Sequence, residues 1–254
     1  MTAARVYKLG GPALEDPGLL APLARELRAT EGQAVVVHGG GRHVDRLLRA
    51  LSIESRFVGG RRETSPAAME VVEMVLSGVV NKAVAAGLTA AGTPAVGISG
   101  RDAGLIAAGL QPDLGRVGTP LRVDATLLRT LWQAGLLPVV SPVSSGPAGE
   151  SVNVNADEAA LALAVALGAE TLLYLTDADG VLVDGAPVDV LAAADARRLI
   201  DAGTITGGMS LKVRVALAAA AAGVSEVVVA GKARLQGDFQ GTRIVASVPE
   251  PAAR

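Results

Sequence analysis

Two glycine-rich turns near the start of the chain combine residue types that bind anions. Lys8-Leu9-Gly10-Gly11 ends one short apolar segment, and His38-Gly39-Gly40-Gly41 ends the next. Glycines directly after parallel strands let backbone N–H groups approach an anion, and a following helix N-terminus adds a favourable dipole. Either turn alone could be an ordinary strand–helix connection. Two of them at neighbouring strand ends could clamp a polyphosphate or a carboxylate, so the pair predicts an anion site.

A cluster of polar side chains occupies residues 151–157, just before an alanine-rich segment that starts near Glu158. Asn155 or Asp157 could cap a helix there, because their side-chain oxygens accept hydrogen bonds from the first free amides. Capping uses one such residue, whereas Asn153, Asn155 and Asp157 are all present. The cluster therefore indicates a polar site as well as a helix cap.

Two later segments give weaker signals. Thr176–Leu182 follows an apolar strand and could be an ordinary turn, or could wrap a nucleotide at the edge of a sheet. Thr204–Lys212 opens another helix and contains Gly207-Gly208. Lysine near a helix N-terminus is slightly unfavourable with the dipole, and a bound anion would remove that objection. Since the chain has only four lysines, Lys8 and Lys212 both call for an explanation.

Two common nucleotide-binding motifs are absent. The chain lacks Gly-x-x-x-x-Gly-Lys-[Ser/Thr], so it is not a P-loop protein, and it lacks Gly-x-Gly-x-x-Gly in the first turn, which disfavours a dinucleotide-dependent oxidoreductase. His38, alone at a strand end, is interpreted as a structural residue.

Short β-branched segments alternate along the chain with longer amphipathic ones. Strands are expected at Arg5–Leu9, Ala34–His38, Ala95–Ile98, Leu137–Ser141, Thr171–Thr176 and Glu226–Ala230. Helices are expected at Pro17–Glu31, His43–Leu51, Ala67–Ala91, Asp124–Ala134, Asp157–Leu167, Ala192–Ala202 and Gly208–Ala222. This alternation predicts an α/β fold with a mostly parallel sheet and helices on both faces. We expect Asp102–Leu121 to be a loop or hairpin, Pro142–Ser151 to be a loop, and a lobe boundary near Gly168.

The composition narrows the classes of function. The 254 residues carry a net charge of −2 and 2% aromatic side chains, so neither a basic surface nor a stacking platform for nucleic acid is expected. The absence of cysteine excludes disulfides, thiol catalysis and cysteine-based zinc sites. No signal peptide is evident, and the longest uncharged stretch, Thr130–Gly149, contains three prolines. We expect a cytoplasmic protein with small-molecule substrates and no nucleic-acid or membrane partner.

The motifs together resemble those of the N-acetylglutamate kinases in the amino-acid kinase family. The resemblance spans nearly the whole chain and rests on these segments in order: Lys8-Leu9-Gly10-Gly11, Val37–Gly41, Gly60–Thr64, Gly97–Asp102, Asn153–Asp157, Leu175–Asp177 with Gly180, and Gly207–Met209 with Lys212. The most specific part is Asn-Val-Asn-Ala-Asp combined with Arg62. Two departures are Ser65-Pro66, where many relatives carry Asp, and Arg101, where Lys is frequent.

The resemblance implies a catalytic role at three positions and acceptor binding at four. Lys8 and Lys212 would neutralise the transferring phosphoryl group, and Asp157 would hold both lysines in place. The residues implied to bind the acceptor are Gly40 and Gly41 through backbone N–H groups, Arg62 through the α-carboxylate, and Asn153 through the acetylated amino acid.

The nucleotide would bind in the first glycine turn and in two later segments. The implied residues are Gly10, Gly11, Asp177, Ala178, Asp179, Gly180, Val181, Leu182, Thr204, Ile205 and Thr206. The cofactor would be ATP with Mg²⁺ carried by its phosphates, with no metal site made by the protein. The fold would be a three-layer αβα sandwich in one domain, with an acceptor-binding lobe at about 1–168 and an ATP-binding lobe at about 169–254.

The implied reaction is transfer of the γ-phosphoryl of ATP to the γ-carboxylate of N-acetyl-L-glutamate, a step of arginine biosynthesis. That carboxylate is already ionised near neutral pH, so no general base is needed, and this fits a chain with two histidines. One alternative is a sister kinase acting on glutamate, aspartate, a nucleoside monophosphate or a carrier-protein-linked aminoadipate. Another is a non-catalytic sensor on the same fold, which the presence of Lys8, Asp157 and Lys212 together disfavours.

The long helix expected at Ala67–Ala91 carries apolar residues on more than one side, of which only one can face a sheet. We therefore expect a two-fold symmetric homodimer through this helix. Family members inhibited by arginine carry an extra helix before the first strand. Here only Met1–Ala4 precede that strand, so no arginine feedback is expected.

Overall fold

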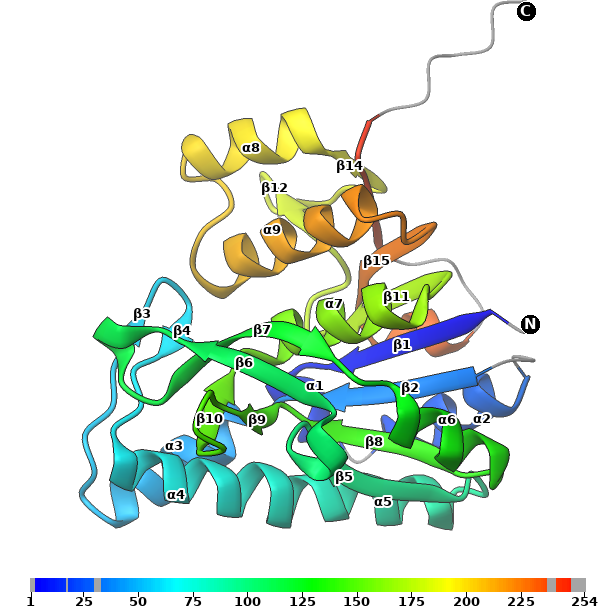
Figure 1. Cartoon of the computed structure of the whole chain (residues 1–254). Helices are drawn as coiled ribbons and strands as arrows, with labels where there is room; N and C mark the ends of the chain where they lie inside the picture. Colours follow the sequence, from blue (N-terminus) through cyan, green and yellow to red (C-terminus); the bar gives the residue numbers. More distant parts are fainter. Residues whose placement is uncertain (1–2, 17, 30–32, 237–240, 248–254) are drawn as a thin grey trace, which may run out of the picture.

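One eight-stranded sheet runs through the centre of the protein (Figure 1). The structure, a computed structural model, describes residues 3–16, 18–29, 33–236 and 241–247. In spatial order the strands are β14 (Val190–Ala192), β16 (Thr242–Val245), β15 (Glu226–Ala230), β11 (Thr171–Leu175), β1 (Ala4–Leu9), β2 (Gln33–His38), β8 (Leu137–Ser141) and β5 (Ala95–Ser99). Neighbouring strands are parallel except for β15 and β16. The six expected strands are all confirmed.

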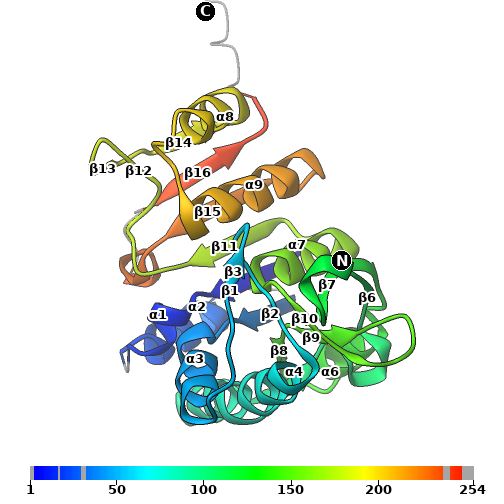
Figure 2. The ribbon, with the colours of Figure 1, turned by 90° about the vertical axis from the view of Figure 1, so that its left-hand side faces the viewer.

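Helices cover both faces of this sheet, as Figure 2 shows. Successive strand residues alternate between two buried cores: Val35 and Val37 point into one and Val36 into the other. The first core packs against α6 (Thr126–Gln133), α7 (Ala156–Leu167), α8 (Ala193–Asp201) and α9 (Gly207–Ala221). The second packs against α2 (Leu20–Ala29), α3 (Gly41–Ala50), α4 (Pro66–Glu73) and α5 (Asn81–Ala90). The predicted three-layer αβα sandwich is confirmed.

Most expected helices are confirmed with ends shifted by one or two residues. The helix expected at Pro17–Glu31 is α2, which begins at Leu20. Pro17 and residues 30–32 lie outside the described residues. One short helix, α1 (Gly11–Leu14), follows the first glycine turn and was not expected. The division into lobes near residue 168 stays a prediction, because β1 pairs directly with β11 and a single sheet runs through both parts.

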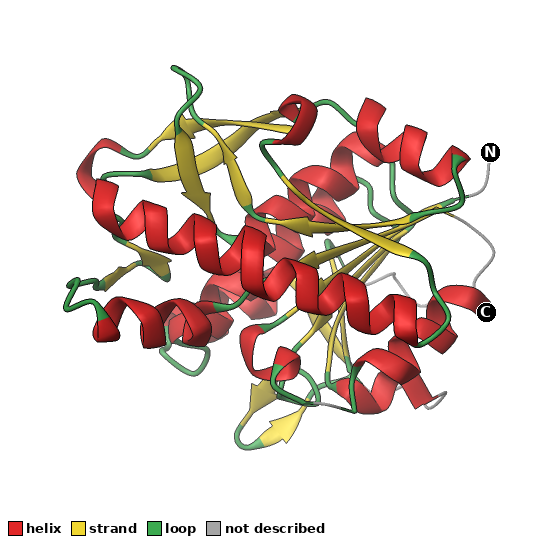
Figure 3. Ribbon diagram, turned by 90° about the horizontal axis from the view of Figure 1, so that it is seen from below, coloured by secondary structure: helices red, strands yellow, loops and turns green. Residues whose placement is uncertain are grey.

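The longest helical element runs from α4 through a π-helical segment, Met74–Val80, into α5, and lies across the sheet (Figure 3). Ser65 caps its start by accepting a hydrogen bond from the backbone N–H of Ala68 at 3.1 Å. Pro66–Ala90 is long and apolar enough to cross a membrane, but half of its most apolar window is buried inside the protein, as in a core helix. The π segment was not expected; π turns occur frequently at functional sites.

A small closed barrel stands beside the sheet, formed by β6 (Ile106–Leu110), β7 (Val117–Val123), β9 (Val143–Ser145) and β10 (Ser151–Val154). The hairpin expected within Asp102–Leu121 is confirmed by the antiparallel pairing of β6 with β7. The loop expected at Pro142–Ser151 is partly wrong, because β9 forms there by pairing with β10 and β6. Two further hairpins pair β3 (Phe57–Val58) with β4 (Arg61–Arg62) and β12 (Leu182–Val183) with β13 (Ala186–Pro187).

Candidate active site

One buried carboxylate holds two lysines at the centre of the molecule. The Nζ atom of Lys8, on β1, lies 2.7 Å from Oδ1 of Asp157. The Nζ atom of Lys212, on α9, lies 3.0 and 3.1 Å from Oδ1 and Oδ2 of the same side chain. All three residues are at most 7% exposed. The structure therefore brings together the three residues assigned a catalytic role.

The residues before Asp157 explain why its carboxylate is available to bind both lysines. Asn155 caps α7, because its side-chain oxygen accepts the backbone N–H groups of Asp157 and Glu158 at 2.8 and 3.4 Å. Capping thus uses the Asn155 side chain, as the sequence allowed, and leaves the Asp157 carboxylate to the lysines.

The cluster carries one more positive charge than negative. Burial acts to raise the pKa of Asp157, but Lys8 and Lys212 outweigh it and hold that pKa at about 2. Burial, reinforced by the charge of Lys8, lowers the pKa of Lys212 to about 8. The Nζ atom of Lys212 also lies 5.3 Å from the ring centroid of Tyr174. Buried charge without a partner is costly, so the excess positive charge favours binding of an anion.

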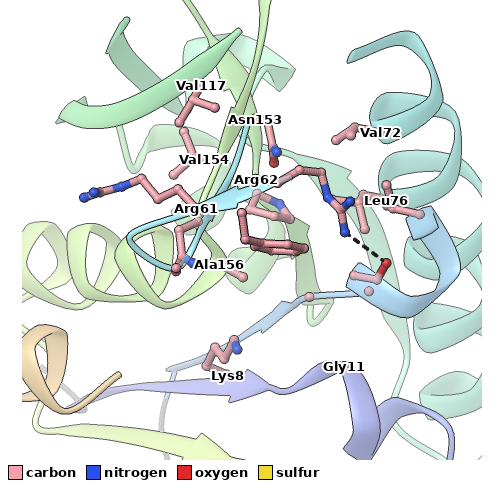
Figure 4. A pocket seen from close by; sticks show the side chains of 18 residues that line it. Lys8, Gly11, Arg61, Arg62, Val72, Leu76, Val117, Asn153, Val154 and Ala156 are labelled. Atoms are coloured by element: carbon pink, nitrogen blue, oxygen red, sulfur yellow. Dashed lines mark hydrogen bonds between the residues drawn. The ribbon is translucent and has the colours of Figure 1, made fainter. Parts of the chain in front are cut away.

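A cavity of about 200 Å³ opens next to Lys8. Figure 4 shows Lys8 on one side of it, with Arg62 and Asn153 on the other. Gly11, Gly40 and Gly41 also line it. The cavity therefore contains the four residues assigned to the acceptor, together with one of the two lysines. Asp157 and Lys212 are not part of its lining: Asp157 contacts Lys8, and Lys212 contacts Asp157.

The second glycine turn requires glycine at Gly40 for two reasons. Its φ of 147° lies in the region that side chains rarely adopt, and a Cβ there would be 2.8 Å from Cδ2 of Leu76 on the π segment. In the described part of the chain the N–H of Gly40 donates to no backbone carbonyl. A Cβ on Gly11 would lie 3.7 Å from the backbone N of Gly41, so the two turns face each other. Their geometry leaves backbone donors available to an anion.

His38 stabilises this turn through a hydrogen bond to its backbone. Its Nδ1 lies 2.8 Å from the carbonyl oxygen of Gly39, and its Nε2 lies 3.0 Å from Nδ2 of Asn81. Burial lowers the pKa of His38 to about 4, so the ring is neutral, with Nδ1 donating and Nε2 accepting. Asn81 also donates to the carbonyls of Ile98 and Val139, which ties the turn to β5 and β8. Sequence reasoning missed Asn81, whose signal was a polar residue inside an apolar helix.

Three neighbours fix the guanidinium of Arg62 at the cavity wall. One nitrogen lies 2.6 Å from Oδ1 of Asp45, and another donates to Oγ of Ser55 at 3.0 Å. The guanidinium carbon lies 4.5 Å from the ring centroid of Phe57. None of these three residues was singled out from the sequence, because Ser55 and Phe57 belong to no recognisable motif and Asp45 lies in an ordinary amphipathic helix.

Arg62 and Asn153 are joined through Thr64. Nδ2 of Asn153 donates to Oγ1 of Thr64 at 3.0 Å, and that hydroxyl donates to the carbonyl of Arg62 at 2.7 Å. Thr64 is fully buried, so this link is protected from water. The β4 segment and β10 are therefore held in a fixed relation at the acceptor side of the cavity.

The predicted nucleotide segments alternate between buried and exposed residues. Val181 and Ile205 are buried in the core, so these two could meet a nucleotide only through their backbone. Gly180 has a φ of 153°, and a Cβ there would lie 2.7 Å from Oγ1 of Thr242. Asp177 and Asp179 are exposed, as are Leu182, Thr204 and Thr206. Nucleotide binding by these segments stays a prediction.

A family model described as the amino acid kinase family matches residues 4–231. A protein named acetylglutamate kinase from Rubrobacter xylanophilus is 44% identical over 256 residues, covering 98% of both chains. Another protein of that name, from Geobacillus kaustophilus, is 44% identical and covers 94% of this chain and 95% of its own.

Solved structures of similar fold cover nearly the whole chain. The crystal structure of smu.665 from Streptococcus mutans is 28% identical, has a TM-score of 0.88, and covers 97% of this chain and 100% of its own. A carbamate kinase from Giardia, at 16% identity and a TM-score of 0.70, shares the fold. From the family match and these relatives, the chain belongs to the amino acid kinase family.

Proposed function

We propose that this chain is an acetylglutamate kinase, which transfers the γ-phosphoryl group of ATP to the γ-carboxylate of N-acetyl-L-glutamate in arginine biosynthesis. The carrying observation is the arrangement of the cavity: Lys8, backed by Asp157 and Lys212, lies opposite Arg62 and Asn153. The names of relatives that are 44–47% identical over most of the chain support this proposal.

The acceptor would bind through three groups of the cavity. Arg62 can pair with the α-carboxylate, because a guanidinium offers two parallel N–H donors to a carboxylate. Asn153 would hydrogen-bond the acetamido group. The backbone N–H groups of Gly40 and Gly41 would hold the γ-carboxylate near Lys8, where it can attack the phosphorus in line.

The chemistry needs charge stabilisation rather than proton transfer. The attacking carboxylate is ionised at neutral pH, and the transferring group carries negative charge on its equatorial oxygens. Lys8 and Lys212 would neutralise that charge in a preorganised site, with Asp157 keeping both ammonium groups in place. The acyl phosphate product hydrolyses readily, so exclusion of water from the cavity would protect it.

The nucleotide would lie along Gly10 and Gly11, the 177–182 loop and the 204–206 segment before α9. Among the described residues no group of three or more His, Cys, Asp or Glu could hold a metal ion. We propose that Mg²⁺ enters with ATP, bound to the nucleotide phosphates.

We also infer a two-fold homodimer through the long helix. Met74 and Val79 on its π segment are 55% and 63% exposed, an unusual position for large apolar side chains on one short stretch. Light scattering of the wild type should give twice the mass of one chain. Val79→Glu should shift the protein toward monomer, whereas an unchanged mass in that variant would contradict the interface. A cytoplasmic location remains a prediction.

A coupled assay of ADP release tests the proposed activity. Release should require N-acetyl-L-glutamate and should be slow with glutamate, aspartate or a nucleoside monophosphate. Release at a similar rate with any of these, or none with the acetylated amino acid, would contradict the proposal. A sensor without catalytic activity would bind ATP but release no ADP.

A further inference from the structure

A second, larger hollow lies between α7 and α9. It measures about 740 Å³, within the range common for small-molecule sites. Most of its lining is apolar side chain from α7, α9 and β7, including Leu121, Leu161, Val165, Leu211, Val215 and Ala218. Leu121 and Val165 are 75% and 47% exposed, so apolar surface faces water here. We call this hollow the α7–α9 groove.

The rim of the groove is cationic. Three arginines and one glutamate line it, and Arg61 is paired with that glutamate, Glu158. Arg122 and Arg214 are exposed, and neither makes an ion pair or a side-chain hydrogen bond within residues 3–16, 18–29, 33–236 and 241–247. Asp124 lies outside the lining, and its pKa is lowered mainly by the hydrogen bonds that it accepts from Thr126, with a smaller contribution from the charge of Arg122. An apolar floor with two unpaired cations favours an elongated apolar molecule that bears one anionic group.

The groove touches the active site through three pairs of adjacent residues. Arg61 in the groove precedes Arg62 in the catalytic cavity, and Glu158 follows Asp157. In the third pair, Leu211 lines the groove and Lys212 contacts Asp157.

The tip of the β3–β4 hairpin also contacts α9 beside the groove. A Cβ on Gly60 would lie 3.0 Å from Cδ2 of Leu211, so the hairpin that carries Arg62 rests on α9. A ligand between the hairpin tip, α7 and α9 would therefore displace Arg62 and Lys212 from the positions that in-line transfer needs.

We propose that the α7–α9 groove is a regulatory site for a small amphipathic anion, such as a medium-chain carboxylate, and that its occupancy lowers turnover. The effect on turnover rests on the proposed kinase function, whereas binding in the groove does not. The anionic group would pair with Arg122 and Arg214, and the apolar chain would lie on Leu161, Val165 and Ala218.

Calorimetric titration with decanoate, below its micelle concentration, tests the site. We expect saturable binding of one decanoate per chain, at least tenfold weaker binding of decanol, and no displacement by a non-hydrolysable ATP analogue. The double variant Arg122→Glu/Arg214→Glu should weaken decanoate binding at least tenfold. Arg25→Glu/Arg197→Glu makes the same charge change at two exposed arginines outside the groove and should leave binding unchanged.

Filling the groove gives an independent check. Ala218→Trp should abolish decanoate binding, because the indole ring would occupy the groove. Far-UV circular dichroism would show whether this variant is folded. The two charge variants change only exposed side chains, so they should fold like the wild type. In the wild type, saturating decanoate should lower kcat several-fold, and Arg122→Glu/Arg214→Glu should lose this response.

Each outcome has a distinct meaning. Absent binding, equal binding by both charge variants, or displacement by the ATP analogue would overturn the groove site. Binding without any change in kcat would overturn its regulatory role. Binding intact in a chain that phosphorylates no acceptor would contradict the proposed function alone.

Discussion

The two sides of the catalytic cavity use positive charge in different ways. On one side Lys8 and Lys212 share the single carboxylate of Asp157, and all three residues are buried, which leaves one positive charge unmatched. On the other side Arg62 has its own carboxylate, Asp45, whose side chain is 39% exposed. The first side is built to attract charge that grows during transfer, and the second is built to orient a charge already present in the substrate. The first should therefore affect kcat, and the second KM.

The largest effect is expected at the lysines. Lys8→Ala or Lys212→Ala should lower kcat about 10²–10³-fold, by analogy with loss of one preorganised donor to a developing oxyanion. Steady-state kinetics with both substrates would measure it. Lys232→Ala removes an exposed lysine paired with Asp16 and serves as the matched control, with near-normal turnover. A near-normal kcat in Lys8→Ala or Lys212→Ala would contradict the role of these lysines in stabilising the transferring group.

The pH dependence of turnover tests the charge of Lys212. Since the pKa of Lys212 is lowered to about 8 in the free enzyme and its protonated form carries the needed charge, kcat/KM for MgATP should be flat below that pH. Above it, kcat/KM should fall about tenfold per pH unit as Lys212 loses its proton. Lys212→Arg, if active, should lose this limb because guanidinium stays protonated. A profile that is flat up to pH 10 would show that Lys212 keeps its proton.

The opposite side of the cavity should respond through binding. Arg62→Lys should raise KM for N-acetyl-L-glutamate about tenfold or more, because a lysine cannot make the bidentate pair, and should leave KM for ATP nearly unchanged. Arg42→Lys alters an exposed arginine paired with Glu15 and should change neither constant. An equal rise in both KM values for Arg62→Lys would place Arg62 at the nucleotide.

The smallest effect concerns the support beneath the glycine turn. A Cβ at Gly97 would lie 2.2 Å from Oδ1 of Asn81, so Gly97→Ala should displace Asn81 and loosen its contact with His38. We expect a loss of stability of about 1–3 kcal/mol, as for other overpacked cores, with kcat lowered several-fold. Gly78→Ala, where a Cβ meets nothing within 4 Å, should not lower stability. Urea unfolding and kinetics would compare the two variants, and equal stabilities would contradict the role of Asn81.

The sequence predicted the longer apolar strands of the central sheet and failed at strands of three or four residues. The six expected strands are five or six residues long and mostly apolar. β14 and β16 have three and four residues at one edge of the sheet, and β9 has three. Such strands exist because of partners far along the chain, so local periodicity carries little signal for them.

The sequence predicted some residues of the active site and missed others. Lys8, Asp157 and Lys212 stood out through rarity, capping position and family resemblance, and the structure brings them together. Asp45 lies in an ordinary amphipathic helix, and nothing in its spacing shows that it reaches Arg62. Residues that orient others through tertiary contacts are visible only once the fold is known.

Trapping the product with hydroxylamine tests the central claim most directly, because an acyl phosphate reacts with it to give a hydroxamate. With ATP, Mg²⁺ and N-acetyl-L-glutamate, we predict one hydroxamate for each ADP released, a rate lower by about 10²–10³-fold in Lys8→Ala, and none without the acceptor. ADP release without hydroxamate, or equal hydroxamate formation from unacetylated glutamate, would contradict the account.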